Sequence, residues 1–493
     1  MSFFDWDKIA QQLVYNESDR LLFNSTFFLC FLFLFLVAYR LVIKTGTVRI
    51  ITVCLFSIYF FYKACGHYVV FILIAAVVDF YLSNAIHASV HHARRKLLLV
   101  LSIILNLGLL CAFKFTVPFI AFYNNFLNGT LTVPDIGIPV GISFYTFENL
   151  SYTIDVYRKK FTPVKRFMDY LFFLSYFPKL MMGPIVRASD FIPQLRKEIN
   201  LSQHDIAKGL FLICTGVFKK IVISDYILLN LVNYVFDDPL RHTGMECLFA
   251  VYGYALIIYC DFSGYSDMAI GIAKWLGFDI NINFLAPYQS SNITEFWRRW
   301  HISLSTWLKD YLYIPLGGNR LGKVRTYINL FITMLLGGVW HGAGINFIIW
   351  GALHGLALGV HKVWMERYPA AALSKPTGLL RGVYMLLTFH FVCFCWIFFH
   401  ADNFSAATDM IFQIATNFYW SGWATFAGNY LPVLALMAFG FALHLLPLRY
   451  NDMLIDKLAP LHWLVKAAIA VILIFIIVQV RVADTVLPIY LQF

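Results

Sequence analysis

Residues 97–121 read LLLVLSIILNLGLLCAFKFTVPFIA, and Lys114 is the one charged residue in this run. A helix needs about 20 consecutive apolar residues to cross the hydrocarbon core of a bilayer, so the run predicts a membrane-spanning helix. Similar runs recur along all 493 residues, of which 60% are hydrophobic and 13% charged. A typical soluble domain is about 25% charged. The sequence therefore predicts an all-α polytopic membrane protein.

Eleven apolar runs are predicted to be transmembrane helices, and two further apolar stretches are broken by glycine and proline. The eleven runs cover residues 23–42, 50–63, 68–86, 97–121, 208–235, 246–275, 326–340, 343–363, 380–400, 427–446 and 461–481. The broken stretches, 139–156 and 167–186, predict re-entrant or partly spanning segments, since irregular backbone at membrane depth must be buried in protein or line a cavity. We expect one integral membrane unit over 1–493.

The formal net charge is +11 at pH 7. Although this charge is basic, the chain is too apolar to be disordered or to be a nucleic-acid-binding domain. Lys and Arg in short loops favour the cytoplasm. Basic residues follow the first and third predicted helices, at 40–49 and 94–96, whereas the loop after the fourth has none. The N-terminus is therefore expected outside the cytoplasm.

Residues 283–320 read NFLAPYQSSNITEFWRRWHISLSTWLKDYLYIPLGGNR. Asn292 followed three residues later by Glu295 has the form of a helix start. The segment is too charged for a span, so we expect a helix at the membrane interface. On a helical period, His301 shares an apolar stripe with Trp297, Leu304 and Leu308 and points into the protein. Such a histidine is either a hydrogen-bonded core residue or part of a site. The charges of the segment include Arg298, Arg299, Lys309 and Asp310.

Residues 335–355 read LLGGVWHGAGINFIIWGALHG. The glycines on both sides of His341 are expected to weaken a helix and to let a substrate approach the backbone closely. A buried imidazole rests neutral because burial disfavours its charged form, so it can accept a proton. A general base that activates a hydroxyl needs this property. His354 is expected to have a packing or hydrogen-bonding role.

Other ionisable residues lie in apolar surroundings, namely Asp261, Asp267, Glu148 and Lys179. Intramembrane charges are costly and usually face a cavity or one another. Both a substrate pathway and a structural ion-pair network explain these four residues, so both interpretations stay open.

Five motifs in sequence order resemble the membrane-bound O-acyltransferase family, in its bacterial branch of alginate O-acetylation and teichoic acid D-alanyl transfer. They are GISFYTFENLSYTIDVYR, FPKLMMGPIVR, DFSGYSDMAIG, NFLAPYQSSNITEFWRRWHISLSTWLKDYLYIPLGG and GGVWHGAGINFIIWGALHG, and the resemblance covers about residues 60–400. It implies that His341 is the catalytic histidine and that His301 is the second polar position of the site. It also implies a ring of tilted helices around a central tunnel.

The function implied is transfer of a short acyl group, acetyl above all, from a cytoplasmic thioester to hydroxyls of an extracytoplasmic polysaccharide. His341 would act as general base, in the bacterial inner membrane. His301 would orient the acceptor or donate a hydrogen bond to the oxyanion. A soluble extracytoplasmic acyltransferase is an expected partner. Residues expected to bind substrate or donor are Trp297, Arg298, Arg299, Trp340, Asp310, Asp261, Asp267, Glu148 and Lys179.

The donor is open between acetyl-CoA and an acylated carrier protein. With a carrier protein, the alternative function is transfer of D-alanyl or another acyl group to a cell-envelope polymer. No bound cofactor or metal is expected. No glycine-rich phosphate loop is present, so basic residues such as Arg298 and Arg299 would have to hold coenzyme A. The acidic surface of a carrier protein would also suit a basic cytoplasmic face. Two interpretations of another class are a glycan or lipid transporter and a non-catalytic assembly scaffold. Neither gives a reason for the two histidine motifs.

Overall fold

The computed structural model describes residues 11–17, 20–23, 25–42, 46–369, 376–480 and 486–489. These residues form helices and no strand. They divide into two compact units, one of Met1–Asp205 with Met268–Asn281, the other of Ile206–Asp267 with Ile282–Phe493. We refer to them as the N-terminal and C-terminal units. The expectation of a single integral unit over the whole chain stays a prediction.

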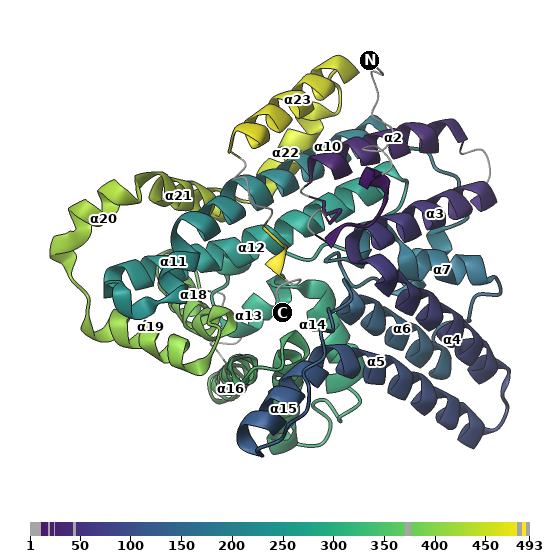
Figure 1. The fold of residues 1–493 in the computed structure, drawn as a ribbon, viewed down its shortest axis with the longest axis horizontal. Coiled ribbons are helices and arrows are strands. Elements are labelled where there is room, and N and C mark those ends of the chain that lie inside the picture. The colour runs from purple at the N-terminus through teal and green to yellow at the C-terminus, as the bar shows by residue number, and fades with distance from the viewer. Residues whose placement is uncertain are drawn as a thin grey trace. The chain divides into compact units, whose positions relative to one another are not determined.

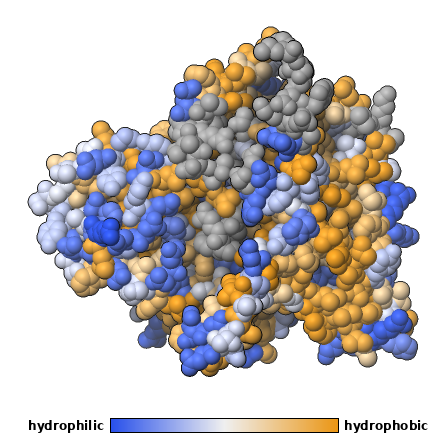
Figure 2. Space-filling model, viewed as in Figure 1, coloured by the Kyte–Doolittle hydropathy of each residue, from blue (hydrophilic) through white to orange (hydrophobic). Residues whose placement is uncertain are grey.

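The N-terminal unit is built from apolar helices. They are α2 (Thr26–Val42), α3 (Gly46–Cys65), α4 (Val69–Ala88), α5 (His92–Phe126), α6 (Ile142–Tyr157), α7 (Phe167–Ser175), α8 (Phe177–Leu180) and α9 (Ala188–Phe191). Helices α4, α5 and α6 pack against one another, and α3 packs on α7 (Figure 1). Apolar side chains cover much of the visible face over α3 and α4 (Figure 2), as expected of helices that contact lipid.

The C-terminal unit contains both histidine motifs. Its first helices are α10 (Gln203–Val217), the π-helical turns η4 (Phe218–Asp225) and η5 (Leu228–Val232), α11 (Asn233–Asp237), α12 (Gly244–Trp275), α13 (Ile293–Arg299), α14 (Ile302–Leu308) and the π-helical turn η8 (Lys309–Tyr313). The later ones are α15 (Lys323–His341), α16 (Ile345–Arg367), α18 (Gly378–His400), α19 (Phe404–Thr416), α20 (Trp423–Asn429), α21 (Leu431–Leu445), α22 (Arg449–Leu458) and α23 (Trp463–Val480). The first residues of α10, up to Asp205, and the last residues of α12, from Met268, are counted with the N-terminal unit.

Five described helical runs are long and apolar enough to cross a membrane, or six if one bent pair counts as a span. They are Gly46–Ala88, His92–Phe126, Gly244–Trp275, Ile345–Arg367, Gly378–His400 and the pair Trp420–Asn429 with Leu431–Leu445, bent by 93°. The all-helical membrane architecture is thus confirmed, whereas the count of eleven spans stays a prediction. The predicted span 208–235 is interrupted by two π-helical turns, and the first of them, η4, carries Lys219 and Lys220. The broken stretch 167–186 contains the short helices α7 and α8.

Glycines set the distance between α15 and α16. A Cβ on Gly338 would lie 2.2 Å from the carbonyl oxygen of Phe347, and one on Gly351 would lie 2.6 Å from that of Met334. The expectation of a weakened helix before His341 is therefore wrong, because α15 continues through the glycines to His341. The backbone of α16, rather than a substrate, uses the space that Gly338 leaves, as small residues allow between membrane helices.

Candidate active site

His301 lies at a break between two short helices. Helix α13 begins where predicted, since the Asn292 side chain accepts a hydrogen bond of 2.8 Å from the Glu295 backbone N–H. The prediction of one continuous helix is wrong, because His301 has a φ of +41°, in the left-handed region, and separates α13 from α14. Trp297 and Leu304 are nevertheless buried, as the apolar stripe predicts.

The side chain of Asn283 orients the ring of His301. Its Oδ1 accepts hydrogen bonds from the Ser303 backbone N–H and hydroxyl, at 3.2 and 2.8 Å, and lies 3.2 Å from His301 Nδ1. Because an N–H can only donate, this oxygen is an acceptor, and Nδ1 must carry the hydrogen that faces it. In the neutral ring, Nε2 then holds the lone pair. Phe262 of α12 packs edge-on to the same ring, with the centroids 4.6 Å apart.

His341 ends α15 and is only 4% exposed. Its ring packs edge-on against Trp350 of α16 and Phe399 of α18, with centroid distances of 5.1 Å in both cases. The indole of Trp340 lies 4.8 Å from the ring of His341 and 6.4 Å from that of His301, centroid to centroid. The structure thus brings the two histidine motifs together around one indole, in what we call the histidine cluster (His301, Trp340, His341, Trp350 and Phe399).

His354 borders the cluster but is held by its neighbours. It is fully buried, its ring lies 4.9 Å from that of Trp350, and Trp297 Nε1 donates a hydrogen bond of 3.3 Å to its Nδ1. The packing and hydrogen-bonding arrangement expected for His354 is what the structure contains.

Two predicted carboxylates on α12 are in ion pairs. Asp261 accepts from Lys220 at 2.5 Å and from the Ile489 backbone N–H at 2.9 Å. Asp267 pairs with Lys219 at 2.6 Å. Neither lysine was predicted as a site residue, although two adjacent charges within the apolar run 208–235 are a usable signal. These contacts agree with the ion-pair interpretation.

The other predicted polar residues lie elsewhere. Glu148 and Lys179 belong to the N-terminal unit, where they form a buried ion pair with each other. Glu148 also accepts from the Val186 backbone N–H at 3.1 Å, so the pair joins α6 to the broken segment. Asp310 lies in η8, beyond α14. Among the described residues, no three His, Cys, Asp or Glu side chains form a group that could hold a metal ion.

Arg298 and Arg299 line a pocket of about 910 Å³ between α13, α16 and the start of α18. Arg299 pairs with Glu295 at 2.7 Å and donates to the Leu285 carbonyl at 3.1 Å, while Arg298 is exposed. The third arginine of the pocket, Arg381, was not predicted, because 82 residues separate it from Arg299 and only the packing of α18 brings it there. We call this cavity the arginine pocket.

Comparison with known proteins identifies the family. Residues 69–396 match the model of the membrane-bound O-acyltransferase family. The chain belongs to this family. The acyltransferase is 36% identical over 367 residues to the peptidoglycan O-acetyltransferase of Helicobacter pylori, covering 69% of each chain.

Two other relatives carry names that refer to other polymers. The acyltransferase is 40% identical over 324 residues to a protein of Pseudomonas syringae pv. tomato named probable alginate O-acetylase AlgI, covering 63% of this chain and 59% of that one. It is 29% identical over 286 residues to the teichoic acid D-alanyltransferase of Bacillus subtilis, covering 54% and 69%. The resemblance described from the motifs is confirmed.

Proposed function

We propose that the acyltransferase moves an acetyl group from a cytoplasmic thioester to hydroxyls of an extracytoplasmic polysaccharide, with His341 as general base. The histidine cluster carries the proposal, because it holds two buried imidazoles beside one indole. The names of the three relatives, which refer to peptidoglycan, alginate and teichoic acid, support a cell-envelope polymer as acceptor.

The chemistry is a direct displacement. The acceptor hydroxyl gives its proton to the His341 imidazole while its oxygen attacks the thioester carbonyl. The new C–O bond forms, the C–S bond breaks, and the departing thiolate takes the proton from the imidazolium. Positioned proton transfer of this kind contributes about 10²–10⁴-fold to the rate.

His301 orients the acceptor in this account. With Nδ1 donating to Asn283, the neutral ring presents the Nε2 lone pair, which accepts a hydrogen bond from a sugar hydroxyl. This tautomer favours an orienting role over donation to the oxyanion, the other role that the sequence leaves open.

The arginine pocket supports a phosphate-bearing donor. Arginines bind phosphate through paired N–H groups, and the pocket volume of about 910 Å³ lies within the range of about 300–1,000 Å³ common for small-molecule sites. We therefore favour acetyl-CoA. A carrier protein with an acidic surface is the alternative donor, because it would meet the same arginines.

The helix ends support the direction of transfer. One end of the α15, α16 and α18 group carries the basic residues Lys323, Arg325, Lys362, Arg367 and Arg381, whereas the opposite ends, at 341–345 and 400–402, have no Lys or Arg. The positive-inside rule assigns the basic end to the cytoplasm. His341, at the far end of α15, then faces an acceptor that arrives from outside.

The proposal can be tested in inside-out membrane vesicles supplied with acetyl-CoA that carries a label in its acetyl group. We expect base-labile label in polysaccharide, lost at least 100-fold in His341→Gln and largely kept in the control His354→Gln at equal protein levels. Arg298→Gln should raise KM for acetyl-CoA while Lys309→Gln leaves it unchanged. Label that enters only from an acylated carrier protein would overturn the choice of donor, and equal loss in both histidine variants would overturn the role of His341.

A further inference from the structure

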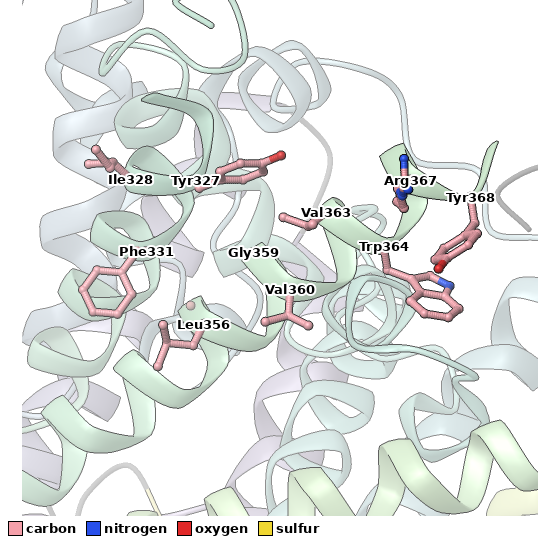
Figure 3. Close-up of a pocket in the computed structure, with 11 residues that line it drawn as sticks. Tyr327, Ile328, Phe331, Leu356, Gly359, Val360, Val363, Trp364, Arg367 and Tyr368 are labelled. Atoms are coloured by element: carbon pink, nitrogen blue, oxygen red, sulfur yellow. The ribbon is translucent and has the colours of Figure 1, made fainter. Parts of the chain in front are cut away.

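A second cavity, of about 650 Å³, lies along α15 and α16 and shares no lining residue with the histidine cluster. Its walls are apolar side chains of both helices, including Phe331, Leu356, Val360 and Val363 (Figure 3). Leu356 is 57% exposed and Val360 70%, so the cavity is an open groove. We call it the α15–α16 groove.

The groove contains free space beside Gly359. Gly359 lines the groove, and a Cβ built on it would meet nothing within 4 Å. One turn earlier, Gly355 is in close contact with α15, since its Cβ would lie 3.0 Å from Cα of Phe331. The helices therefore touch at Gly355 and separate towards Gly359, which leaves a channel for an elongated apolar group.

The groove becomes polar at the end of α16, where it is lined by Trp364, Arg367 and Tyr368 (Figure 3). The neighbouring acid, Glu366, is already bound to α15, because it pairs with Lys323 at 3.2 Å and accepts from the Tyr327 hydroxyl at 3.0 Å. Within the part of the chain that the structure describes, Arg367 forms no ion pair with an acidic side chain.

We propose that the α15–α16 groove binds an anionic phospholipid, with one acyl chain along Val360 and Leu356 and the phosphate at Arg367. Trp and Tyr are enriched at the headgroup level of membranes, and basic residues beside them attract anionic lipid headgroups. Charge complementarity selects this occupant over a partner's transmembrane helix, whose apolar surface would leave Arg367 without a counterion. The groove shares no lining residue with the histidine cluster, and among the described residues Trp364 is the one that lines both the groove and the arginine pocket.

Native mass spectrometry of the purified full-length protein, titrated with phosphatidylglycerol or phosphatidylcholine, tests the proposal. Gly359→Leu is chosen to fill the groove, because a Cβ at this position would meet nothing within 4 Å. Gly382→Leu on α18, where a Cβ would also meet nothing within 4 Å, is its control. Arg367→Gln removes the cation, with the exposed Lys457→Gln as its control. Unchanged circular dichroism and Tm will establish that each variant folds.

The wild type should retain one phosphatidylglycerol in preference to phosphatidylcholine. Gly359→Leu should weaken that binding at least tenfold and Arg367→Gln about fivefold, while both controls match the wild type. Equal retention of the two lipids, or unchanged binding by Gly359→Leu, would overturn the proposal. So would a Gly359→Leu-sensitive complex with a second copy of the chain or another protein in place of lipid.

Discussion

In the proposed mechanism, Asn283 determines which nitrogen of His301 is left to accept a hydrogen bond from the acceptor. His301 lies between α13 and α14, outside the helices that qualify as spans, and burial lowers its pKa, so the ring is neutral near pH 7. In Asn283→Asp the carboxylate still accepts from Nδ1 but stabilises the imidazolium, which raises the pKa of His301. Activity that needs neutral His301 is lost as the pH falls through that pKa. We therefore expect the acid limb of the pH–rate profile to move to higher pH.

The pH–rate profile of kcat/KM in membrane vesicles checks this effect. Asn283→Ala is the comparison, because it removes the hydrogen bond without adding a charge. It should lower the rate and leave the acid limb closer to that of the wild type. A profile for Asn283→Asp with an unmoved acid limb would contradict the orienting role of a neutral His301.

Single-residue features were the least predictable from the sequence. The helical period correctly predicts that His301 is buried, because burial follows from the apolar stripe. It does not predict the left-handed backbone of His301, which depends on how α14 packs. The contact with Asn283 was also missed, since it joins an irregular segment to a helix start 18 residues later. The side chains that hold the site come from such contacts rather than from local periodicity.

At the scale of the element, the contact between α15 and α16 positions His341. Gly338→Ala would place a methyl group 2.2 Å from the Phe347 carbonyl oxygen, so the helices must move apart. We expect a loss of about 1–3 kcal/mol in unfolding free energy, as for other overpacked sites, seen as a lower Tm in detergent. Gly382→Ala, where nothing lies within 4 Å, should not lower Tm. Equal values of Tm for the two variants would contradict close packing of this pair.

Variants of the buried pair of Lys179 and Glu148 can show whether Lys179 stabilises the fold or binds the acyl donor. Both side chains are at most 3% exposed, and removing one partner of a buried pair typically costs about 3–5 kcal/mol. Lys179→Met should therefore reduce folded protein in the membrane strongly. Lys179→Met combined with Glu148→Gln should restore both folded protein and acyl transfer. A double variant that folds but has a raised donor KM would instead assign donor binding to Lys179.

Helices are predicted well because apolar runs of sufficient length have few alternatives in a membrane. The predicted runs 246–275, 343–363 and 380–400 agree closely with α12, α16 and α18. The run 208–235 was predicted as one regular helix, but the half-buried Lys219 and the buried Lys220 pair with carboxylates on α12, and π-helical turns occur there. Hydropathy does not register such pairing, because the partner is distant in sequence.

At the scale of the whole molecule, the orientation of the C-terminal unit can be measured. If the basic end of α15 faces the cytoplasm, a cysteine at Lys323→Cys should react with a membrane-impermeant maleimide only in inside-out vesicles. Asp402→Cys, exposed just beyond the end of α18, should react only in right-side-out vesicles. The parent protein with its nine native cysteines is the background control. The reverse labelling pattern would contradict the proposed path from a cytoplasmic donor to an outside acceptor.

The most direct test of the account is the ester-linked acetyl content of cell-envelope polysaccharide in cells that carry the wild type, His341→Gln or His354→Gln at matched membrane levels. Loss of the general base should lower transfer by about 10²–10⁴-fold, so His341→Gln should leave the polymer without measurable acetyl ester. His354→Gln should retain most of it. Undiminished acetylation in the His341→Gln strain would contradict the account and make His341 a packing residue of the histidine cluster.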